Sequence, residues 1–485
     1  MDSAKSKQPS PLRQLLSLLT ENVERLECIA AAAAAPIPDL HTPFSLESEA
    51  FRAIPEAAEA ARIVSAAALH LDAILAPPQI SIFRVVDGHF KSAALRICLE
   101  SGVTEILREA GPEGLSTSEI AAKNGQDADK LARFLRYLAT HHVYREVSPN
   151  VFANTRLSSM LDTGKSSEEI LKSPDTKYEA TSGLAAVAAH HLDEVFKASA
   201  NAWETLCDGD PAEGDPSLSP FARAMKLERG ETMWAYFAKP EVQTKARRFD
   251  IAMQGILGFQ PPNAIVNSYD WAALPQGAVV VDVGGGVGTT CFALAERFPN
   301  LKLVLQDQEA VLGHAKKMWE ERMPDALTSG RVQLQLHNFF SEQPQISASV
   351  FVIKHASLDW ADKYAKEIFS RLWDAATPDT TLLVLDIVMP LACRENAETS
   401  TTSHIPGAAL PEAPEPLLPN YGGANDMAYN VDFAMFLLTN SQTRTAAHFM
   451  GLLASVGWKV VRIHGQGGDS AYIKSVEAKK VANLN

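Results

Sequence analysis

Short apolar runs alternate with helix-like spacing from residue 279 onward, which is typical of a parallel α/β sheet. The apolar runs predict strands at 279–283, 302–306, 332–336, 350–353 and 381–387, with closing strands at 460–464 and 471–475. Helices are expected at 293–297, 431–438 and 448–456. A stretch rich in Pro, Ser and Thr, roughly 396–420, predicts an irregular insertion after the fifth strand.

The chain before this sheet has helical periodicity. Residues 1–75 are rich in Ala and Leu and predict a helical extension. Residues 76–185 predict a winged-helix module: Ser116 and Glu119 form a capping box, Asp127 caps a second helix, and a hairpin turns at 148–150. A helical linker and the sheet are expected to fill residues 186–485. Most of the six aromatic side chains of the linker are predicted to be core, and the others to line a pocket for an apolar substrate: Phe196, Trp203, Phe221, Trp234, Tyr236 and Phe237.

Composition narrows the function classes. The 485 residues are 46% hydrophobic and 21% charged, which is ordinary for a globular protein, and the net charge of −14 gives no basic footprint for nucleic acid. DNA binding is the alternative role of a winged helix, but acidic residues are mixed with the basic ones there, so a dimerisation role is favoured. No apolar run reaches 18 residues and no signal peptide is evident, so we expect no membrane contact and a cytoplasmic location. Five scattered cysteines without a CxxC pair predict neither disulfides nor a metal site.

A glycine-rich turn after the first strand is the strongest chemical signal. Residues 279–290 run from Val279 into Asp282, Gly284 and Gly286 and then into a helix. Glycines allow a sharp turn and let a ligand approach where a Cβ would clash. The spacing differs from the dinucleotide pattern GxGxxG, which alone would be weak.

Two further elements fall at the ends of the next strands. Asp307 and Gln308 follow the second strand, where an acid can bind both ribose hydroxyls; the alternative is a helix N-cap aspartate. Asn338 and Phe339 follow the third strand, where an amide and an aromatic ring can bracket an adenine. Together the three elements predict a nucleoside-containing cofactor.

Over roughly residues 80–475 the chain resembles the plant and fungal small-molecule O-methyltransferases. The resemblance rests on 281–288, 306–308, 351–360, 383–390 and 467–469. It implies a Rossmann-like class I methyltransferase domain preceded by a helical winged-helix dimerisation domain, and a homodimer. It also implies S-adenosylmethionine held by Asp282, Gly284, Gly286, Asp307, Gln308, Asn338, Phe339 and Lys354.

The chain departs from that family at the catalytic base. The family has Leu-His-Asp-Trp after its fourth strand, and here Leu358 stands in the place of the histidine. A general base is worth ~10²–10⁴-fold, and leucine cannot accept a proton. Of the two acids that orient the histidine in the family, one matches Asp386 and the other position is Thr443. An alternative is that His355, three residues upstream, is the base.

Some fungal enzymes of this fold have lost the histidine and work as pericyclases, and the chain resembles them. This similarity predicts dehydration and an Alder-ene or hetero-Diels–Alder closure of an apolar substrate in secondary metabolism. Lys354 and His355 would polarise a carbonyl, with Asp386 beside them. Four side chains are expected to line the substrate pocket: Thr232, Met427, Asn430 and Met435.

Two other functions stay open. One is a genuine S-adenosylmethionine-dependent O-methyltransferase that acts on a polyketide or phenolic hydroxyl. The other is a regulatory protein without catalysis, which the intact cofactor motif disfavours.

Overall fold

The computed structural model describes residues 9–208, 214–256, 258, 260–261, 263–396, 400–465 and 468–481. The chain forms two compact units that interleave along the sequence. The helical unit comprises Met1–Asn201, Met233–Phe259 and Ala413–Ala424. The sheet unit comprises Ala202–Thr232, Gln260–Glu412 and Asn425–Asn485. The three-part division expected from sequence position alone stays a prediction.

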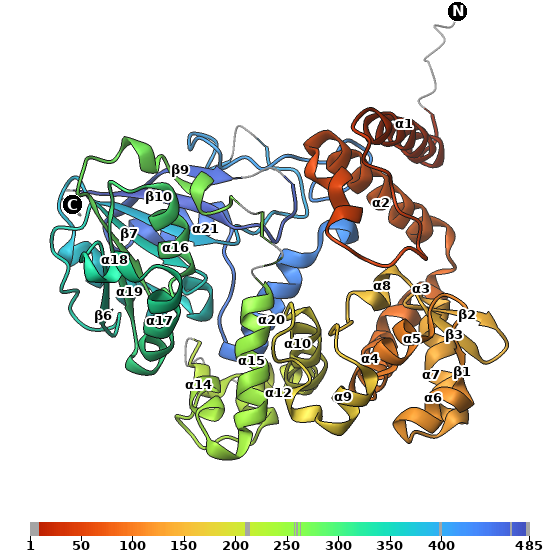
Figure 1. The fold of residues 1–485 in the computed structure, drawn as a ribbon. Helices are drawn as coiled ribbons and strands as arrows, with labels where there is room; N and C mark the ends of the chain where they lie inside the picture. Colours follow the sequence, from red (N-terminus) through yellow and green to blue (C-terminus); the bar gives the residue numbers. More distant parts are fainter. Residues whose placement is uncertain are drawn as a thin grey trace, which may run out of the picture. The chain divides into compact units, whose positions relative to one another are not determined.

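The sheet unit is built on seven described strands in the order β6-β5-β4-β7-β8-β10-β9. Figure 1 labels β6, β7, β9 and β10 of this sheet. The strands β4 to β8 pair in parallel, as the alternating pattern predicted, and β10 runs antiparallel to β8 and β9. The strands are β4 Val279–Val283, β5 Lys302–Asp307, β6 Val332–Leu336, β7 Val350–Lys354, β8 Thr381–Asp386, β9 Trp458–Gly465 and β10 Lys474–Lys480.

The last strand begins three residues later than the predicted 471–475. The residues before β10 form hydrogen bonds with loop residues and do not pair with a neighbouring strand. The backbone N–H and the hydroxyl of Ser470 donate to the side-chain and backbone oxygens of Asn425, and the backbone N–H of Ile473 donates to the side chain of Gln260. Part of the predicted insertion, residues 397–399, and Gly467 of the closing motif lie outside the described residues.

Helices cover both faces of the sheet, because alternate residues of each buried strand point to opposite sides. On one face Val281 and Phe351 pack with Phe369 of α19 and Phe449 of α21. On the other face Phe292 of α16 stacks on Trp319 of α17, with ring centroids 3.7 Å apart. The helices of this unit are α12 Ala202–Cys207, α13 Pro220–Ala224, α16 Thr289–Arg297, α17 Glu309–Arg322, α18 Pro324–Thr328, α19 Asp362–Ala375, α20 Met427–Thr439 and α21 Ala446–Ala454.

The helical unit contains the predicted winged helix. Ser116 and Glu119 form the capping box of α6, and Asp127 caps α7 through the N–H of Lys130. The hairpin β2 Tyr144–Ser148 and β3 Val151–Asn154 gains a short third strand, β1 Leu115–Ser116, which two residues could not signal. The helices are α1 Pro11–Ala32, α2 Pro55–Leu75, α3 Pro78–Val86, α4 Gly88–Glu100, α5 Val103–Ala110, α6 Thr117–Asn124, α7 Ala128–Thr140, α8 Arg156–Ser159, α9 Ser167–Lys172, α10 Leu184–His190, α11 Phe196–Ser199, α14 Met233–Phe237 and α15 Gln243–Ile256.

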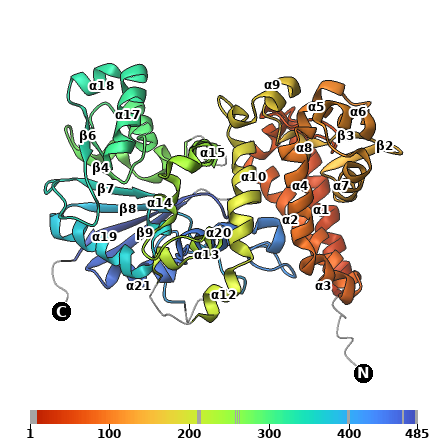
Figure 2. The same ribbon diagram turned by 90° about the horizontal axis from the view of Figure 1, so that it is seen from below.

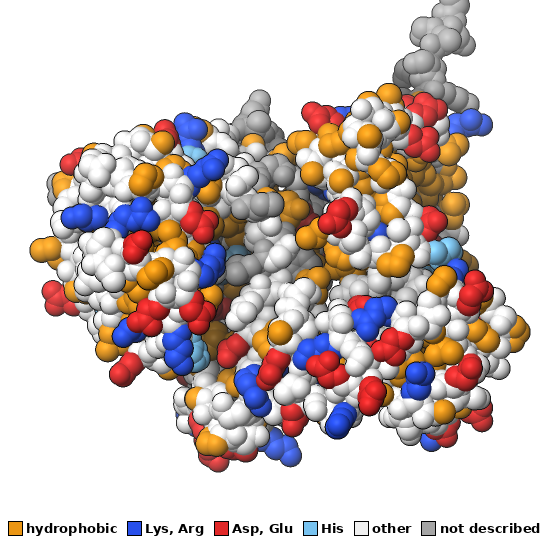
Figure 3. Space-filling model, in the orientation of Figure 1, with side chains coloured by type: hydrophobic (Ala, Val, Ile, Leu, Met, Phe, Trp, Pro, Cys, Tyr) orange, Lys and Arg blue, Asp and Glu red, His pale blue; other side chains and the backbone are white. Residues whose placement is uncertain are grey.

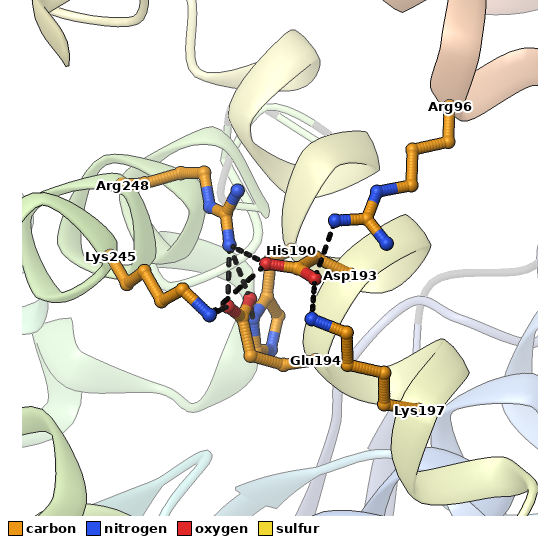
Figure 4. A network of polar contacts seen from close by, with 7 residues as sticks. All are labelled: Arg96, His190, Asp193, Glu194, Lys197, Lys245 and Arg248. Carbon is orange, nitrogen blue, oxygen red and sulfur yellow. Dashed lines mark hydrogen bonds and ion pairs between the residues drawn. The ribbon is translucent and has the colours of Figure 1, made fainter. Parts of the chain in front are cut away.

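A polar network joins α4, α15 and the π-helical turn His191–Val195, which follows α10, within the helical unit (Figure 4). Figure 2 labels α4, α10 and α15 in the ribbon. Arg248 donates to both carboxylate oxygens of Glu194, at 2.5 and 2.6 Å, and to Asp193 at 3.1 Å. Burial opposes the charge of Asp193, but hydrogen bonds from Lys197 and other cations hold its pKa below the ordinary value. The remaining partners are Arg96, His190 and Lys245. Asp193 and Glu194 are buried, and a buried charge is costly unless it is paired, so removal of a cationic partner is expected to destabilise the fold.

Two of the six linker aromatics are on the surface. Phe221, Tyr236 and Phe237 are buried as expected, but Trp203 is 71% exposed and Trp234 is 41% exposed. Trp203 lies on α12, a six-residue helix without a buried side chain, which cannot cover an indole ring.

Several expected absences concern the part of the chain that is described. All five cysteines are free. No cluster of possible metal ligands occurs among the described residues. No single described helix is long and apolar enough to cross a membrane, although the bent pair α2 and α3 meets the criterion by length and composition. Acidic and basic side chains are intermixed on the face drawn in Figure 3.

Candidate functional site

The turn after β4 has the backbone that the glycine motif predicted. Gly284, Gly286 and Gly288 have φ of 66°, 62° and 93°, which favour glycine. Gly285 has no room for a side chain, because a Cβ would lie 2.5 Å from the carboxylate of Asp282. The N–H groups of Gly284 and Gly285 both donate to the carbonyl of Gln306, at 2.9 and 3.2 Å. These bonds tie the turn to β5.

Asp307 faces this turn from the end of β5. Its Oδ2 accepts from the N–H of Gly286 at 2.8 Å and its Oδ1 from the N–H of Gln308 at 2.7 Å. Burial raises the pKa of Asp307, and the two N–H donors oppose that rise. The alternative role as a helix N-cap is wrong, because Gln308 is the N-cap of α17 and its side chain makes no cap bond. The carboxylate is therefore held in place beside the glycine turn.

The space beside Gly286 suits a bound nucleoside. A Cβ at this glycine would meet no heavy atom within 4 Å, so the backbone there borders open space. The ring of Phe339 comes within 3.3 Å of the Cβ position of Gly284, which places an aromatic face next to the turn. Phe340 and Trp360 continue this wall, with centroids 4.8 Å apart. Asn338 lies at the exposed end of the wall, and its Oδ1 accepts from the N–H of Phe340 at 3.1 Å.

Asp282 is placed beneath the turn. It is fully buried, and its Oδ1 has no hydrogen-bond partner among the described residues. Burial raises the pKa of Asp282 to about 6, and the charge of Lys354 acts in the opposite direction. Lys354 ends β7, and burial lowers its pKa while Asp282 and Asp386 raise it. The charges of both carboxyls therefore act on the lysine ammonium at the carboxyl edge of the sheet.

His355 follows Lys354 in a left-handed conformation, with φ of 51°. Its backbone N–H donates to the carbonyl of Leu385 at 3.0 Å, and its ring Nε2 is buried without a partner among the described side chains. Burial and the charge of Lys354 lower its pKa to about 3. The imidazole is neutral near pH 7 and is a weak base.

The family's base position lies in a 3-10 turn, Ser357–Asp359, where Leu358 is only 5% exposed. Beside it, Asp386 ends β8 and is buried. Its Oδ2 accepts from the hydroxyl of Ser357 at 2.6 Å and its Oδ1 from the N–H of Ile387 at 2.8 Å. Burial raises the pKa of Asp386 to about 6, and these hydrogen bonds limit the rise. Asp386 therefore anchors the turn.

Two residues of the segment before α21 complete the site. The N–H and hydroxyl of Thr443 donate to Asp432 of α20, at 2.7 and 3.0 Å, so this position serves as a local brace. Arg444 has a fully buried side chain, and it donates to the carbonyls of Ser357 and Trp360 at 2.8 and 2.7 Å. The role of Arg444 could not be predicted from the sequence, because no pattern in the neighbouring residues indicates that an arginine will be buried.

The predicted pocket residues have different surroundings. Met427 and Asn430 are exposed on α20, and Asn430 donates to Asp426 at 3.3 Å. Met435 is half-buried near the end of the same helix, which packs against the 3-10 turn. Thr232 is half-buried at the start of the segment that leads into α14. Their contact with substrate stays a prediction.

Comparison with known proteins agrees with this geometry. Residues 83–164 match a family model described as an O-methyltransferase dimerisation domain, and residues 219–409 match an O-methyltransferase domain. A 4-O-methyltransferase of Phanerochaete chrysosporium is 48% identical over 97% of this chain and 99% of its own. Among solved structures, LepI in complex with S-adenosylmethionine has a TM-score of 0.64 and 18% identity over 96% of this chain and 99% of its own.

A structure described as a pericyclic reaction enzyme also has a TM-score of 0.64, with 17% identity over 96% of this chain and 100% of its own. At such identities these structures establish the fold alone. The expected class I methyltransferase fold with an N-terminal dimerisation domain is confirmed. With the glycine turn, the carboxylate beside it and the sequence match over nearly its whole length, the chain belongs to the S-adenosylmethionine-dependent O-methyltransferase family, and S-adenosylmethionine is its cofactor.

Proposed function

We propose that the chain transfers a methyl group to a phenolic hydroxyl of a small, mostly apolar molecule. The observation that carries this proposal is the 48% identity to a 4-O-methyltransferase over 99% of that relative's length. This support favours the methyltransferase over the pericyclase that the sequence alone suggested, since likeness to the pericyclic enzyme extends to the fold only.

Different residues at the carboxyl edge of the sheet would bind the cofactor and shield the substrate from water. Gly284 and Gly286 would hold the cofactor through their backbone, while Asp307 would accept hydrogen bonds from its ribose. Bound there, S-adenosylmethionine supplies an electrophilic methyl group. The rings of Phe339 and Trp360 exclude water from the adjoining space, which strengthens electrostatic interactions within it. The ammonium of Lys354 would donate hydrogen bonds to polar groups of the cofactor or of the substrate and so orient them.

The test is incubation of the purified chain with methyl-labelled cofactor and a panel of phenols that differ in the hydroxyl position. We expect label in one class of product, with one S-adenosylhomocysteine released per product. Turnover of substrate without transfer of label would contradict the proposal.

A pericyclase is the second candidate, because Leu358 occupies the position of the family's general base. In that case Lys354 and His355 would act as hydrogen-bond donors to a substrate carbonyl. The same incubation distinguishes the two, since an isomerised or dehydrated product carries no label.

We also propose that the chain forms a homodimer. The dimerisation domain match supports it, and so does α3, on which Ile80, Ile82, Phe83, Val85 and Val86 are all exposed. A surface of this kind on a helix is typical of an interface. Light scattering should give twice the mass of one chain, and F83D should reduce it to one.

A further inference from the structure

We propose that Asp359 takes the proton of the substrate hydroxyl, in place of the imidazole that is missing at Leu358. This inference rests on the proposed methyl transfer and names the residue that makes it possible. Asp359 is the next residue on the same 3-10 turn. Successive side chains of such a turn point about 120° apart, so Leu358 can face the core while Asp359 faces another direction.

The turn that carries Asp359 is fixed on both sides. Arg444 donates to the carbonyls of Ser357 and Trp360, and the hydroxyl of Ser441 donates to the carbonyl of Leu358 at 2.6 Å. Three carbonyls around Asp359 are thus held by buried side chains. The turn packs against α20, the helix predicted to line the substrate pocket, and against β8. A carboxyl on this turn therefore has a defined position.

Asp359 differs from Asp282, Asp307 and Asp386 in that neither of its carboxylate oxygens accepts a hydrogen bond from a described residue. It has no hydrogen-bond or ion-pair partner among the described residues, and it keeps part of its surface accessible. Asp386, by contrast, is enclosed and uses both oxygens on Ser357 and Ile387. A proton acceptor must reach the hydroxyl directly or through one water, and of these two carboxyls only Asp359 retains accessible surface.

The basicities of the three candidates agree with this choice. Burial first, and the charge of Asp386 second, raise the pKa of Asp359 to about 8. Asp386 has a pKa of about 6 and His355 of about 3. A phenol ionises near ~10, so the acceptor with the highest pKa takes its proton at the smallest cost.

The charged groups around the turn come from four elements. Asp386 ends β8, Lys354 ends β7, and His355 follows β7. Arg444 precedes α21 and is also paired with Asp362 of α19 at 3.0 Å. Asp386 is the group whose charge acts on Asp359. The ionised form of Asp359 is thus disfavoured by a neighbour of like charge, as a general base near neutral pH requires.

In the proposed step, the substrate O–H bond breaks and a new O–H bond forms on a carboxylate oxygen of Asp359. The electron pair stays on the phenolate oxygen. That oxygen then forms the bond to the methyl group, whose former bonding pair remains on the cofactor sulfur. Asp359 later returns the proton to solvent, so no further reactant is needed.

The test compares wild type with D359N, D359E and D374N, the last an exposed aspartate of α19 that serves as the control. The pH dependence of kcat/KM for methyl transfer should show an acid limb near 8 in wild type and in D374N. D359N should lose ~10²–10⁴-fold near pH 7, with its limb moved toward the ionisation of the phenol itself at ~10. D359E should restore part of the rate together with an acid limb.

A second measurement does not depend on turnover. Infrared difference spectra of the cofactor-free chain, taken below and above pH of about 8, should show loss of a protonated carboxyl band in wild type and no such loss in D359N. An unchanged limb in D359N, or a limb that moves only in D386N, would overturn the assignment. If no phenol is methylated by wild type, the proposed function fails, whereas the infrared band still reports the protonation of Asp359.

Discussion

The glycine turn after β4 and the 3-10 turn after β7 lie at the same edge of one sheet, yet they are encoded differently. The first acts through backbone: positive φ at Gly284 and Gly286, and N–H groups that hold Asp307. The second acts through side chains, with Asp386 and Arg444 fixing the backbone that presents Asp359. A site that binds through its backbone depends on particular residues such as glycine at fixed positions. A site that acts through side chains can exchange one catalytic base for another while the backbone of the turn stays the same.

The largest effect should come from closing the space beside the glycine turn. G286V adds a branched side chain where the structure has no atom within 4 Å, at a φ of 62°. We expect cofactor affinity to fall more than ~100-fold, because the side chain occupies the ligand's approach and strains the backbone. Calorimetry with S-adenosylhomocysteine measures the change.

Gly277 provides a matched control for strain alone. It has φ of 80° and also no atom within 4 Å of its Cβ position, but it precedes β4 at the opposite edge of the sheet. G277V should lose stability to a similar extent and still bind the cofactor. Equal loss of binding in both variants would show that strain explains the effect and would remove the distinction between the two turns.

A smaller effect is expected at the carboxylate that the backbone holds. D307N keeps the shape of the side chain but removes its charge and one acceptor. Because a hydrogen bond to a charged group is worth ~1.5–3 kcal/mol, cofactor affinity should fall ~10–100-fold. E309Q, at an exposed position of α17, is the comparison, and binding in this variant should match wild type. Unchanged affinity in D307N would exclude the ribose role.

In the 3-10 turn Ser357–Asp359, a substitution that lowers activity is expected to raise stability. The pKa of Asp359 is about 8 in the folded state, compared with an ordinary value of ~4. Between pH ~4 and pH ~8, Asp359 is therefore protonated in the folded state and ionised in the unfolded state. Stability contributed by that proton is present in acid and is lost as pH rises through about 8. D359N lacks this loss.

We therefore expect D359N to be more stable than wild type above neutral pH, by at least ~1 kcal/mol, since each unit of pKa shift corresponds to ~1.4 kcal/mol. The two proteins should converge in acid. Urea unfolding at several pH values measures the difference. A D359N variant that is less stable at every pH would show that Asp359 has a structural role.

The smallest effect is expected at His355. Its low pKa makes it a poor base, so H355N, which tolerates the left-handed backbone, should change kcat/KM less than about threefold. The acid limb near 8 should not move. A large loss of kcat/KM with a shifted acid limb would identify His355 as the base and would place the chemistry directly after β7.

The same contrast explains how much could be predicted from the sequence. The five parallel strands, the winged helix and the positions of Gly286 and Asp307 follow from periodicity and from backbone needs that few residues can meet. The uncommitted carboxyl of Asp359 and the buried side chain of Arg444 depend on packing between distant segments. Sequence analysis identified the missing histidine but not the aspartate beside it, since burial and like charge change a pKa only in the folded chain.

The most direct test of the account follows the methyl group in a single turnover. Enzyme in excess over methyl-labelled cofactor is mixed with a phenol that D359N turns over slowly, and the label is counted in product and in remaining cofactor. The account predicts that nearly all label reaches the phenolic oxygen in wild type, with S-adenosylhomocysteine formed in equal amount. Substrate that is converted while all label stays on the cofactor would contradict it.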